Sequence, residues 1–192
     1  MAELITGYGI DLEEIKDSAD ELFTQYLTFN IAGKKFAVSI LDVNEIIEIS
    51  DMTEVPMMPD FIRGVINLRG EVVTVIDLAA RMAKGYSEIG KRSCIVLVEI
   101  TQPAGGKQVI GMLVDAVNEI VEIEQSNIQP APSMGEGVNT DFIQALGRVD
   151  DLFFILLDIN HVLSREQVQL LEQMENAYEP SSRVDKKAVE TE

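Results

Sequence analysis

The residues that could carry out chemistry in this chain are few, and the most suggestive are Asp77 and Asp158. They close two related stretches, FIRGVINLRGEVVTVIDL at 61–78 and FIQALGRVDDLFFILLDI at 142–159, which align without a gap. Two carboxylates can act together as general acid and base, but an aspartate can also cap the chain where it leaves a strand. The two aspartates hold equivalent positions in the repeats, which is compatible with both roles. We favour two structural caps over a catalytic pair.

The remaining reactive side chains point away from an enzyme. His161 follows Asn160 where a strand is expected to end, so we interpret it as a surface or capping residue. A zinc site takes about four Cys, His or carboxylate ligands, and the sequence has no such cluster. Cys94, the only cysteine, opens the apolar run CIVLV and is expected to be a buried packing thiol. Gly105-Gly106-Lys107 lacks the other residues of a phosphate loop and predicts a hairpin turn. We therefore expect no enzyme, metal or cofactor.

One turn occurs in the first stretch alone. The first copy has Asn67-Leu68-Arg69-Gly70 where the second has Arg148-Val149-Asp150-Asp151. Asn67 and Gly70 tolerate positive φ, so we expect this turn to reverse the chain between two strands. Arg69 is either a solvated arginine, the partner of a carboxylate such as Glu45, or an anchor for another protein, a role in which arginine is enriched. The residue pattern leaves these alternatives open.

Composition and charge exclude several classes of function. The chain has 192 residues, enough for one large domain or two small ones that share a core, and its 46% hydrophobic content is typical of folded proteins. No run approaches the roughly 18 apolar residues of a membrane span, and the N-terminus has no signal-peptide order. The net charge of −18 disfavours nucleic acid and anionic membrane surfaces. We expect a cytoplasmic protein, and a basic protein partner is compatible with the charge.

The elements that must position these residues are short strands. Residues 26–31 alternate apolar and polar side chains, and a glycine turn leads to a return strand at 36–40, which together predict a β-hairpin. The second half repeats this arrangement, with strands expected at 94–100 and 109–114. The chain is therefore expected to be mostly β.

A second echo supports a duplication. The segment 33–49 matches 106–123 once one inserted residue near Ala116 is allowed, and within it VNEIIEI at 43–49 lies opposite VNEIVEI at 117–123. The first repeat covers about residues 26–78 and the second about 94–159. Two such repeats of short strands predict two small antiparallel barrels. Barrels of this size bury little core alone, so the halves are expected to pack on each other. The side chains expected at that contact are Val43, Ile46, Ile47, Val117, Ile120 and Val121.

The two ends of the chain have different patterns. Residues 1–24 are acidic and weakly amphipathic, which predicts either a frayed tail with a short helix or disorder. Residues 164–178 return to a helical period, and Ser164 followed by Gln167 is a capping-box signature. The polar residues 179–192 are expected to be a disordered tail. The helical stripe expected to dock on the barrels is Val168, Leu171, Met174 and Tyr178.

The order of these features resembles the CheW family of chemotaxis coupling proteins. The resemblance covers about 25–172, and its most specific part is GVINLRG, beginning at Gly64, with a downstream IDL. It implies two five-stranded SH3-like barrels packed on a shared hydrophobic core, intertwined in sequence, with a C-terminal helix. The chain departs from the family at Thr74, where proline is frequent, and at Ala79, where arginine is frequent.

The resemblance also implies a function. Family members are non-enzymatic adaptors that link the cytoplasmic tips of transmembrane chemoreceptors to the regulatory domain of the histidine kinase CheA, in arrays beneath the inner membrane. Pairing of like barrels, including self-association, builds these arrays. The alternatives are a CheV-like adaptor or a CheA-regulatory-domain-like scaffold in a paralogous two-component pathway. A CheV-type receiver domain is not expected, because too few residues follow the helix.

Carried over residue by residue, the resemblance assigns a receptor and kinase interface. In the family the arginine of the turn can pair with the glutamate of the preceding strand, so Arg69 with Glu45 is the expected ion pair. The remaining assignments flank this pair or lie in the second copy. The full set of interface residues is Val43, Glu45, Gly64, Asn67, Arg69, Gly70, Val117 and Ile120.

Overall fold

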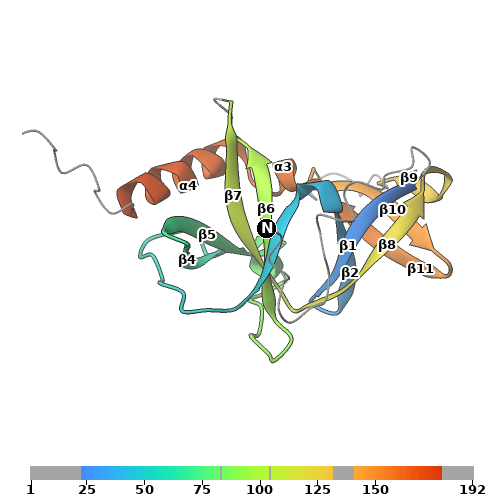
Figure 1. The fold of residues 1–192 in the computed structure, drawn as a ribbon, viewed down its shortest axis with the longest axis horizontal. Helices are drawn as coiled ribbons and strands as arrows, with labels where there is room; N and C mark the ends of the chain where they lie inside the picture. The colour runs from blue at the N-terminus through green and yellow to red at the C-terminus, as the bar shows by residue number, and fades with distance from the viewer. Residues whose placement is uncertain (1–22, 83, 104, 132–140, 179–192) are drawn as a thin grey trace, which may run out of the picture.

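The structure is a computed structural model that describes residues 23–82, 84–103, 105–131 and 141–178, and its regular structure is mostly β (Figure 1). The expectations for the acidic residues before Phe23 and for the tail 179–192 lie outside the described residues. Two sheets stand side by side, and the last helix covers the second of them (Figure 1). The fold expected from the sequence, two small β units with a C-terminal helix, is confirmed.

The first sheet has six strands in the order β8-β1-β2-β11-β10-β9. The second has five, in the order β3-β6-β7-β5-β4. Both are mixed where the sequence predicted antiparallel barrels, because β11 runs parallel to β2 and β5 runs parallel to β7. The bounds in the first sheet are β8 (Ala116–Glu124), β1 (Phe23–Ile31), β2 (Lys34–Ser39), β11 (Leu152–Leu157), β10 (Ile143–Val149) and β9 (Ile128–Pro130). Those in the second are β3 (Val43–Glu48), β6 (Cys94–Thr101), β7 (Lys107–Val114), β5 (Glu71–Asp77) and β4 (Ile62–Leu68).

The boundary between the sheets does not follow the boundary between the repeats. The first sheet takes β1 and β2 from the first repeat and β8 to β11 from the second. The second sheet takes β3 to β5 from the first repeat and β6 and β7 from the second. Each repeat thus gives its first hairpin to one sheet and its remaining strands to the other. Neither sheet can form from one repeat alone.

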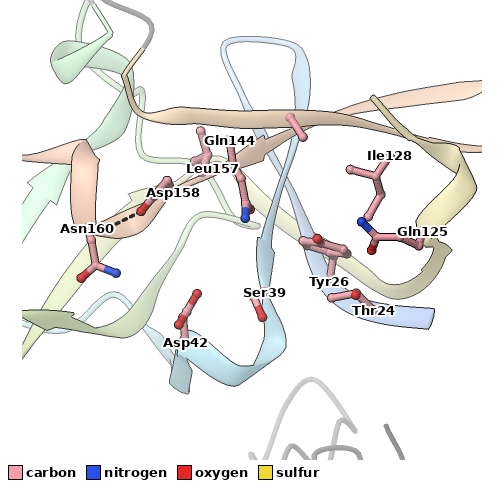
Figure 2. A pocket seen from close by; sticks show the side chains of 11 residues that line it. Thr24, Tyr26, Ser39, Asp42, Gln125, Ile128, Gln144, Leu157, Asp158 and Asn160 are labelled. Atoms are coloured by element: carbon pink, nitrogen blue, oxygen red, sulfur yellow. Dashed lines mark hydrogen bonds between the residues drawn. The ribbon is translucent and has the colours of Figure 1, made fainter. Parts of the chain in front are cut away.

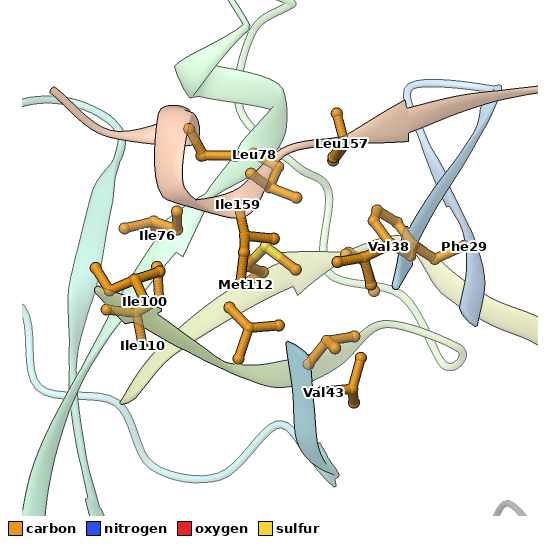
Figure 3. Close-up of a cluster of buried hydrophobic side chains, with 14 of the residues drawn as sticks. Phe29, Val38, Val43, Ile76, Leu78, Ile100, Ile110, Met112, Leu157 and Ile159 are labelled. Carbon is orange, nitrogen blue, oxygen red and sulfur yellow. The ribbon is translucent and has the colours of Figure 1, made fainter. Parts of the chain in front are cut away.

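Three hydrophobic clusters hold the sheets, a large one shared between them and a small one belonging to each. Strand β6 shows how the clusters are separated, since successive side chains of a strand point to opposite faces. Cys94, Val96 and Val98 enter the shared cluster, while Ile95 and Leu97 enter the cluster of the second sheet. Figure 3 shows the shared cluster, with side chains from both sheets meeting around Met112 of β7. The expected burial of Cys94 is confirmed, and the first five residues of β6, 94–98, are all apolar because both faces of the strand are covered there.

The repeated Val-Asn-Glu-Ile segments each contain a β-bulge. Strand β3 gains one residue relative to β6 between Val43 and Glu45. Strand β8 gains one relative to β1 between Val117 and Ile120. A bulge shifts the alternation of faces, so residues three apart share a face. Val43 and Ile46 lie in the shared cluster, as does Val117, and Ile120 packs against it. Ile47 and Val121, also expected at this contact, point the other way into the clusters of their own sheets.

The sequence predicted one long helix but not the four short helical segments of the described chain. Helices α2 (Leu78–Arg81) and α3 (Ile159–Val162) follow the last strands of the two repeats. Helix α4 (Arg165–Tyr178) begins with the predicted capping box. The Ser164 backbone N–H donates to Gln167 Oε1 at 2.8 Å, and the Gln167 N–H donates to Ser164 Oγ at 3.3 Å. Two single-turn segments, η1 (Ile40–Asp42) and η2 (Gln125–Asn127), complete the structure.

Helix α4 docks on the second sheet through an apolar stripe and one carboxylate. Val168, Leu171 and Met174 are buried in the shared cluster as expected, while the side chain of Tyr178 lies outside the described residues. Next to this stripe, the Glu175 carboxylate accepts from the backbone N–H and the hydroxyl of Thr74, at 3.2 and 3.1 Å. Proline has no backbone N–H, so the threonine at this position supplies a donor that proline would lack.

The same carboxylate also binds Gln108, at 2.7 Å from its Nε2. Thr74 and Gln108 are both buried, and they lie on β5 and β7, the parallel pair of the second sheet. Glu175 therefore fastens the helix across the joint between these strands.

A Glu175→Ala variant should lower the free energy of unfolding by about 2 kcal/mol, because it leaves buried donors of Thr74 and Gln108 without an acceptor. Urea unfolding followed by circular dichroism measures the change. Glu172→Ala on the same helix is the matched control and should stay within about 0.5 kcal/mol. Equal effects of the two substitutions would show that Glu175 does not fasten the helix.

Candidate functional site

Asp77, the first candidate for chemistry, is completely buried and used by its own backbone. Its carboxylate accepts from the N–H groups of Ala79 and Ala80 at the start of α2, at 3.0 and 3.2 Å. It also accepts from the N–H and the hydroxyl of Ser87, at 2.8 and 2.9 Å, and lies 3.7 Å from Arg63 Nη1. A carboxylate with all these donors ties the segment after α2 to the sheet, which is a structural role.

Asp158 holds the equivalent place in the second copy. The backbone N–H of Asp158 donates to the Phe142 carbonyl just as that of Asp77 donates to Phe61, at 2.9 and 2.7 Å. Its side chain caps α3 by accepting from the Asn160 N–H at 3.0 Å, and it lies 2.8 Å from His161 Nδ1. The two aspartates therefore cap two helices, as the structural interpretation predicted.

The unmatched turn joins β4 to β5 through two residues, Arg69 and Gly70, which have φ of +55° and +94°. Asn67 was expected to be one of the positive-φ residues, and that expectation is wrong: it pairs with Val72 inside the ladder. Its side-chain Oδ1 instead accepts from the Gly70 N–H at 2.9 Å. Asn67 thus stabilises the turn from within the strand.

The expected ion pair between Arg69 and Glu45 is present. Arg69 Nη2 lies 3.1 Å from Glu45 Oε1, with side-chain exposures of 64% and 27%. Glu45 is on β3 and Arg69 follows β4, and these are the two edge strands of the five-stranded sheet. Edge strands of a flat five-stranded sheet lie about 19 Å apart, farther than these side chains reach. The sheet must curl, and the pair lies across its closing seam.

A second contact closes the same seam. Thr53, in the segment between β3 and β4, forms two backbone hydrogen bonds of 2.9 Å with Val65. Gly64 lies beside this bridge with φ of +151°, and a Cβ there would come within 2.4 Å of the Thr53 carbonyl oxygen. Gly64 is buried beneath the Thr53 segment. A partner protein therefore cannot touch Gly64 directly.

The structure divides the assigned interface residues into an outer and an inner group. Asn67, Arg69 and Gly70 are exposed, and Glu45 joins them at the seam. We call these four the seam cluster. Val43 and Val117 are buried, and Ile120 is partly buried against the shared cluster. Val117 and Ile120 also lie on β8 in the other sheet, so the structure does not bring them to the seam.

The equivalent turn of the second copy has a different surface. It joins β10 to β11 at Asp150 and Asp151, and only Asp150 has positive φ. Next to it, Leu152 and Phe153 are 48% and 59% exposed. The sequence placed both residues in an apolar run and did not predict their exposure, because β11 pairs with β2 only farther along, at Ile155 and Leu156.

A cavity of about 500 Å³ at one end of the first sheet was also not predicted (Figure 2). Its lining includes Tyr26 and Asp42 together with Gln144, Asp158 and Asn160. The residues that line the cavity come from five separate stretches of the chain, so no spacing in the sequence predicts it. The period-two alternation of β1, which puts Tyr26 opposite Leu27, is the only local signal.

Two further findings concern the whole described part of the chain. Within it, no helix is both long and apolar enough to cross a bilayer. Nor do the described residues contain a group of three or more His, Cys, Asp or Glu side chains arranged to hold a metal ion. The site with the most distinctive geometry is therefore a surface, the seam cluster.

Comparison with known proteins gives one consistent result. A family profile described as CheW-like domain matches residues 25–167. The chain is 29% identical to the chemotaxis protein CheW of Klebsiella aerogenes over 80% of this chain and 90% of that protein. It is 32% identical to CheW of Bacillus subtilis over 74% and 88% of the two chains. The crystal structure of the scaffolding protein TtCheW from Thermoanaerobacter tengcongensis superposes with a TM-score of 0.66 at 31% identity, over 77% and 92%.

Proposed function

The chain belongs to the CheW family of non-enzymatic chemotaxis scaffold proteins, and from this premise we propose that it couples transmembrane chemoreceptors to the histidine kinase CheA. The receptor contributes its cytoplasmic tip and the kinase its regulatory domain. The protein then works in the cytoplasm, in receptor arrays beneath the inner membrane, where like-barrel pairing includes contact between its own copies.

The observation that carries this proposal is the seam cluster. It presents an arginine on a rigid two-residue turn, and its guanidinium is already oriented by Glu45 at 3.1 Å. Arginine in a fixed orientation loses little conformational entropy on binding and is enriched among residues that dominate interface energies. The residues of this turn are not repeated in the second copy, where the equivalent turn has Asp150 and Asp151. A protein that links two different partners needs two different faces, and these turns provide them.

The buried interface residues have a supporting part in the proposal. Val43 sits two residues before Glu45, and the bulge between them determines the direction of the glutamate. Val117 and Ile120 do the same for β8 in the first sheet. Their substitution would change the shape of the surface, and they do not need to touch the partner directly.

The test is a reconstitution with receptor-containing membranes, purified CheA and this protein. We expect the kinase to co-sediment with the membranes, and its autophosphorylation to rise, only when this protein is added. Without CheA the protein should not consume ATP. Binding to neither the receptor membranes nor the kinase would contradict the proposal, and binding only to components of a paralogous pathway would redirect it there.

A further inference from the structure

The two repeats place equivalent strand faces on the two sheets, and helix α4 covers one of them. On β5 this face carries Val72, which packs against the shared cluster, and Thr74, whose hydroxyl donates to Glu175 of α4 at 3.1 Å. The equivalent residues of β11 are Phe153 and Ile155, because the two repeated stretches align without a gap. The first sheet therefore has a face of the kind that α4 covers on the second.

The described residues supply no helix for this face of β11. When the same alignment is continued, α4 corresponds to residues 84–97, but 84–93 contain no helix and β6 begins at Cys94. Figure 1 shows α4 over the second sheet, and the described helices pack on β5, β6 and β7 and not along β11. Phe153 is accordingly 59% exposed, whereas its equivalent Val72 is partly buried.

The centre of the face is apolar. Phe153 and Ile155 point to the same side of β11 because they are two residues apart. Ile155 lies opposite Leu146 of β10 in the ladder, so Leu146 shares the face. Leu146 is half-buried, whereas its equivalent in the first copy, Val65, is buried in the shared cluster. Three apolar side chains thus form a surface that the described chain leaves partly uncovered.

Basic side chains flank this apolar centre on both sides. Arg148 of β10 lies opposite Phe153 and is exposed. On the other side, β2 runs parallel to β11 with Phe36 beside Ile155, which places the exposed Lys34 beside Phe153. Among the described residues, neither Lys34 nor Arg148 forms an ion pair with a carboxylate. The surface therefore fits an acidic, amphipathic ligand. We call it the β11 face, and its residues are Lys34, Leu146, Arg148, Phe153 and Ile155.

From these observations we infer that the β11 face binds the acidic N-terminal segment of the same chain, residues 1–22, which lie outside the described residues. Seven of these residues are Asp or Glu and one is Lys. The apolar side chains at helical spacing in the segment are Leu12, Ile15, Ala19 and Leu22. Helix α4, which binds the equivalent face of the second sheet, has the same combination of an apolar stripe and carboxylates.

The segment is long enough to reach the face. It ends at Phe23, the first residue of β1, and β1 is separated from β11 only by β2. Ile31, at the other end of β1, pairs with Lys34 and lies about 26 Å from Phe23 at the usual rise of a strand. A helix over residues 5–22 is about 27 Å long. A segment that runs back along the sheet from β1 therefore reaches Phe153.

The charges of the neighbouring parts of the chain favour this segment and its path. The C-terminal residues 179–192 fit the face less well, because they contain four acidic and three basic residues and follow α4 on the second sheet. The turn beyond the face carries Asp150 and Asp151, which are exposed. Like charges repel, so the acidic segment should lie back along the strands and not over this turn.

The contact is tested in the full chain by paramagnetic NMR. A nitroxide label is attached to a Thr6→Cys variant, and the native Cys94 should not take the label because it is buried. The amide signals of the β11 face should lose most of their intensity. The same label on a Ser181→Cys variant should leave these signals unchanged. The face belongs to the first sheet and the seam cluster to the second, so this test needs no kinase.

Substitutions on the face should release the segment. Lys34→Glu and Phe153→Ser, each made in the chain labelled at Thr6→Cys, should restore most of the lost intensity. Lys91→Glu and Ile89→Ser are the matched controls, since both side chains are exposed outside the face, and they should restore none. Added sodium chloride should also weaken the contact, because salt screens exposed charges.

Two results would overturn the inference. The first is that the label at position 6 leaves the β11 face unchanged, or that the loss of intensity survives both substitutions on the face. The second comes from a mixture of spin-labelled chains with isotope-labelled chains that carry no spin label. Loss of intensity between different molecules would show that the segment binds a second copy, and would overturn its assignment to the same molecule. Kinase activation tests the adaptor function separately, and either result here leaves it intact.

Discussion

Arg69→Glu should keep the fold and lose most of the kinase activation. An interface arginine whose loss costs 2 kcal/mol or more changes binding by about thirtyfold, and we expect an effect of at least tenfold on the concentration needed for half-maximal activation. The new carboxylate would face Glu45, which now lies 3.1 Å from the guanidinium, so the turn would also lose its orientation. The reconstituted receptor and kinase assay measures this change.

The fold should survive because the contact is exposed. A surface ion pair contributes about 0.2–1 kcal/mol to stability, and glutamate at φ of +55° has the same backbone cost as arginine. Urea unfolding should therefore shift by about 1 kcal/mol or less. A large loss of stability would mean that the ion pair at the seam holds the second sheet closed. The loss of kinase activation would then be a result of unfolding and not of a lost contact with the partner.

Arg148→Glu is the matched control for Arg69→Glu. Arg148 lies next to the turn of the second copy and is exposed, and its Nη2 donates to Asn127 Oδ1 at 3.5 Å. The same change of charge there should leave activation within about twofold, since isolated surface substitutions contribute little. The double variant Glu45→Arg with Arg69→Glu restores an ion pair of reversed direction and separates loop geometry from contact with the partner. If Arg69→Glu activates the kinase as well as wild type, the seam cluster is not the site.

Gly64→Ala should be the most destabilising Gly→Ala substitution among the described residues. A Cβ at this position meets the Thr53 carbonyl oxygen at 2.4 Å and Met52 Cγ at 2.9 Å. The backbone oxygen cannot move without breaking the two hydrogen bonds between Thr53 and Val65. We expect the free energy of unfolding to fall by about 3 kcal/mol, in the range of overpacking combined with backbone strain. Urea unfolding measures this loss, and the dependence of the unfolding free energy on urea concentration should not change.

Gly70→Ala separates strain from collision. Gly70 has φ of +94°, but no atom lies within 4 Å of a Cβ built there. Only the left-handed backbone is penalised, so the expected cost is about 1 kcal/mol. Equal costs at the two glycines would show that the Thr53 segment yields to Gly64→Ala, and that the seam is less rigid than its hydrogen bonds indicate.

The parts of the fold that depend on neighbouring residues were predictable. The hairpin from β1 to β2, the strand at Cys94 and the capping box at Ser164 all follow from local rules of alternation, turn and capping. Strand ends were less accurate, since β1 begins at Phe23 and not at Tyr26. The helices α2 and α3 were missed because four residues are too few for a helical period to show.

The candidate site was predictable in part. The ion pair of Arg69 with Glu45 was expected from the family resemblance, since from the residues alone it was one of several alternatives. The role of Asn67 was misjudged, because asparagine suits both a positive-φ position and a side-chain acceptor within the strand. The burial of Gly64 depends on a segment eleven residues away in sequence, Thr53, which no pattern connects to it.

By itself the sequence determined the duplication, the β class and the location of the unusual turn, because these follow from residue type and short-range period. Only the tertiary structure decided which strands share a sheet, which side of a bulged strand is buried, and which polar groups meet. The exchange of strands between the sheets, the closing of the seam between β3 and β4, and the cavity around Tyr26 all join residues far apart in the chain. Such contacts form when the two sheets curl and pack against each other. The local preferences of residues for strand, turn or helix do not determine which distant residues then meet.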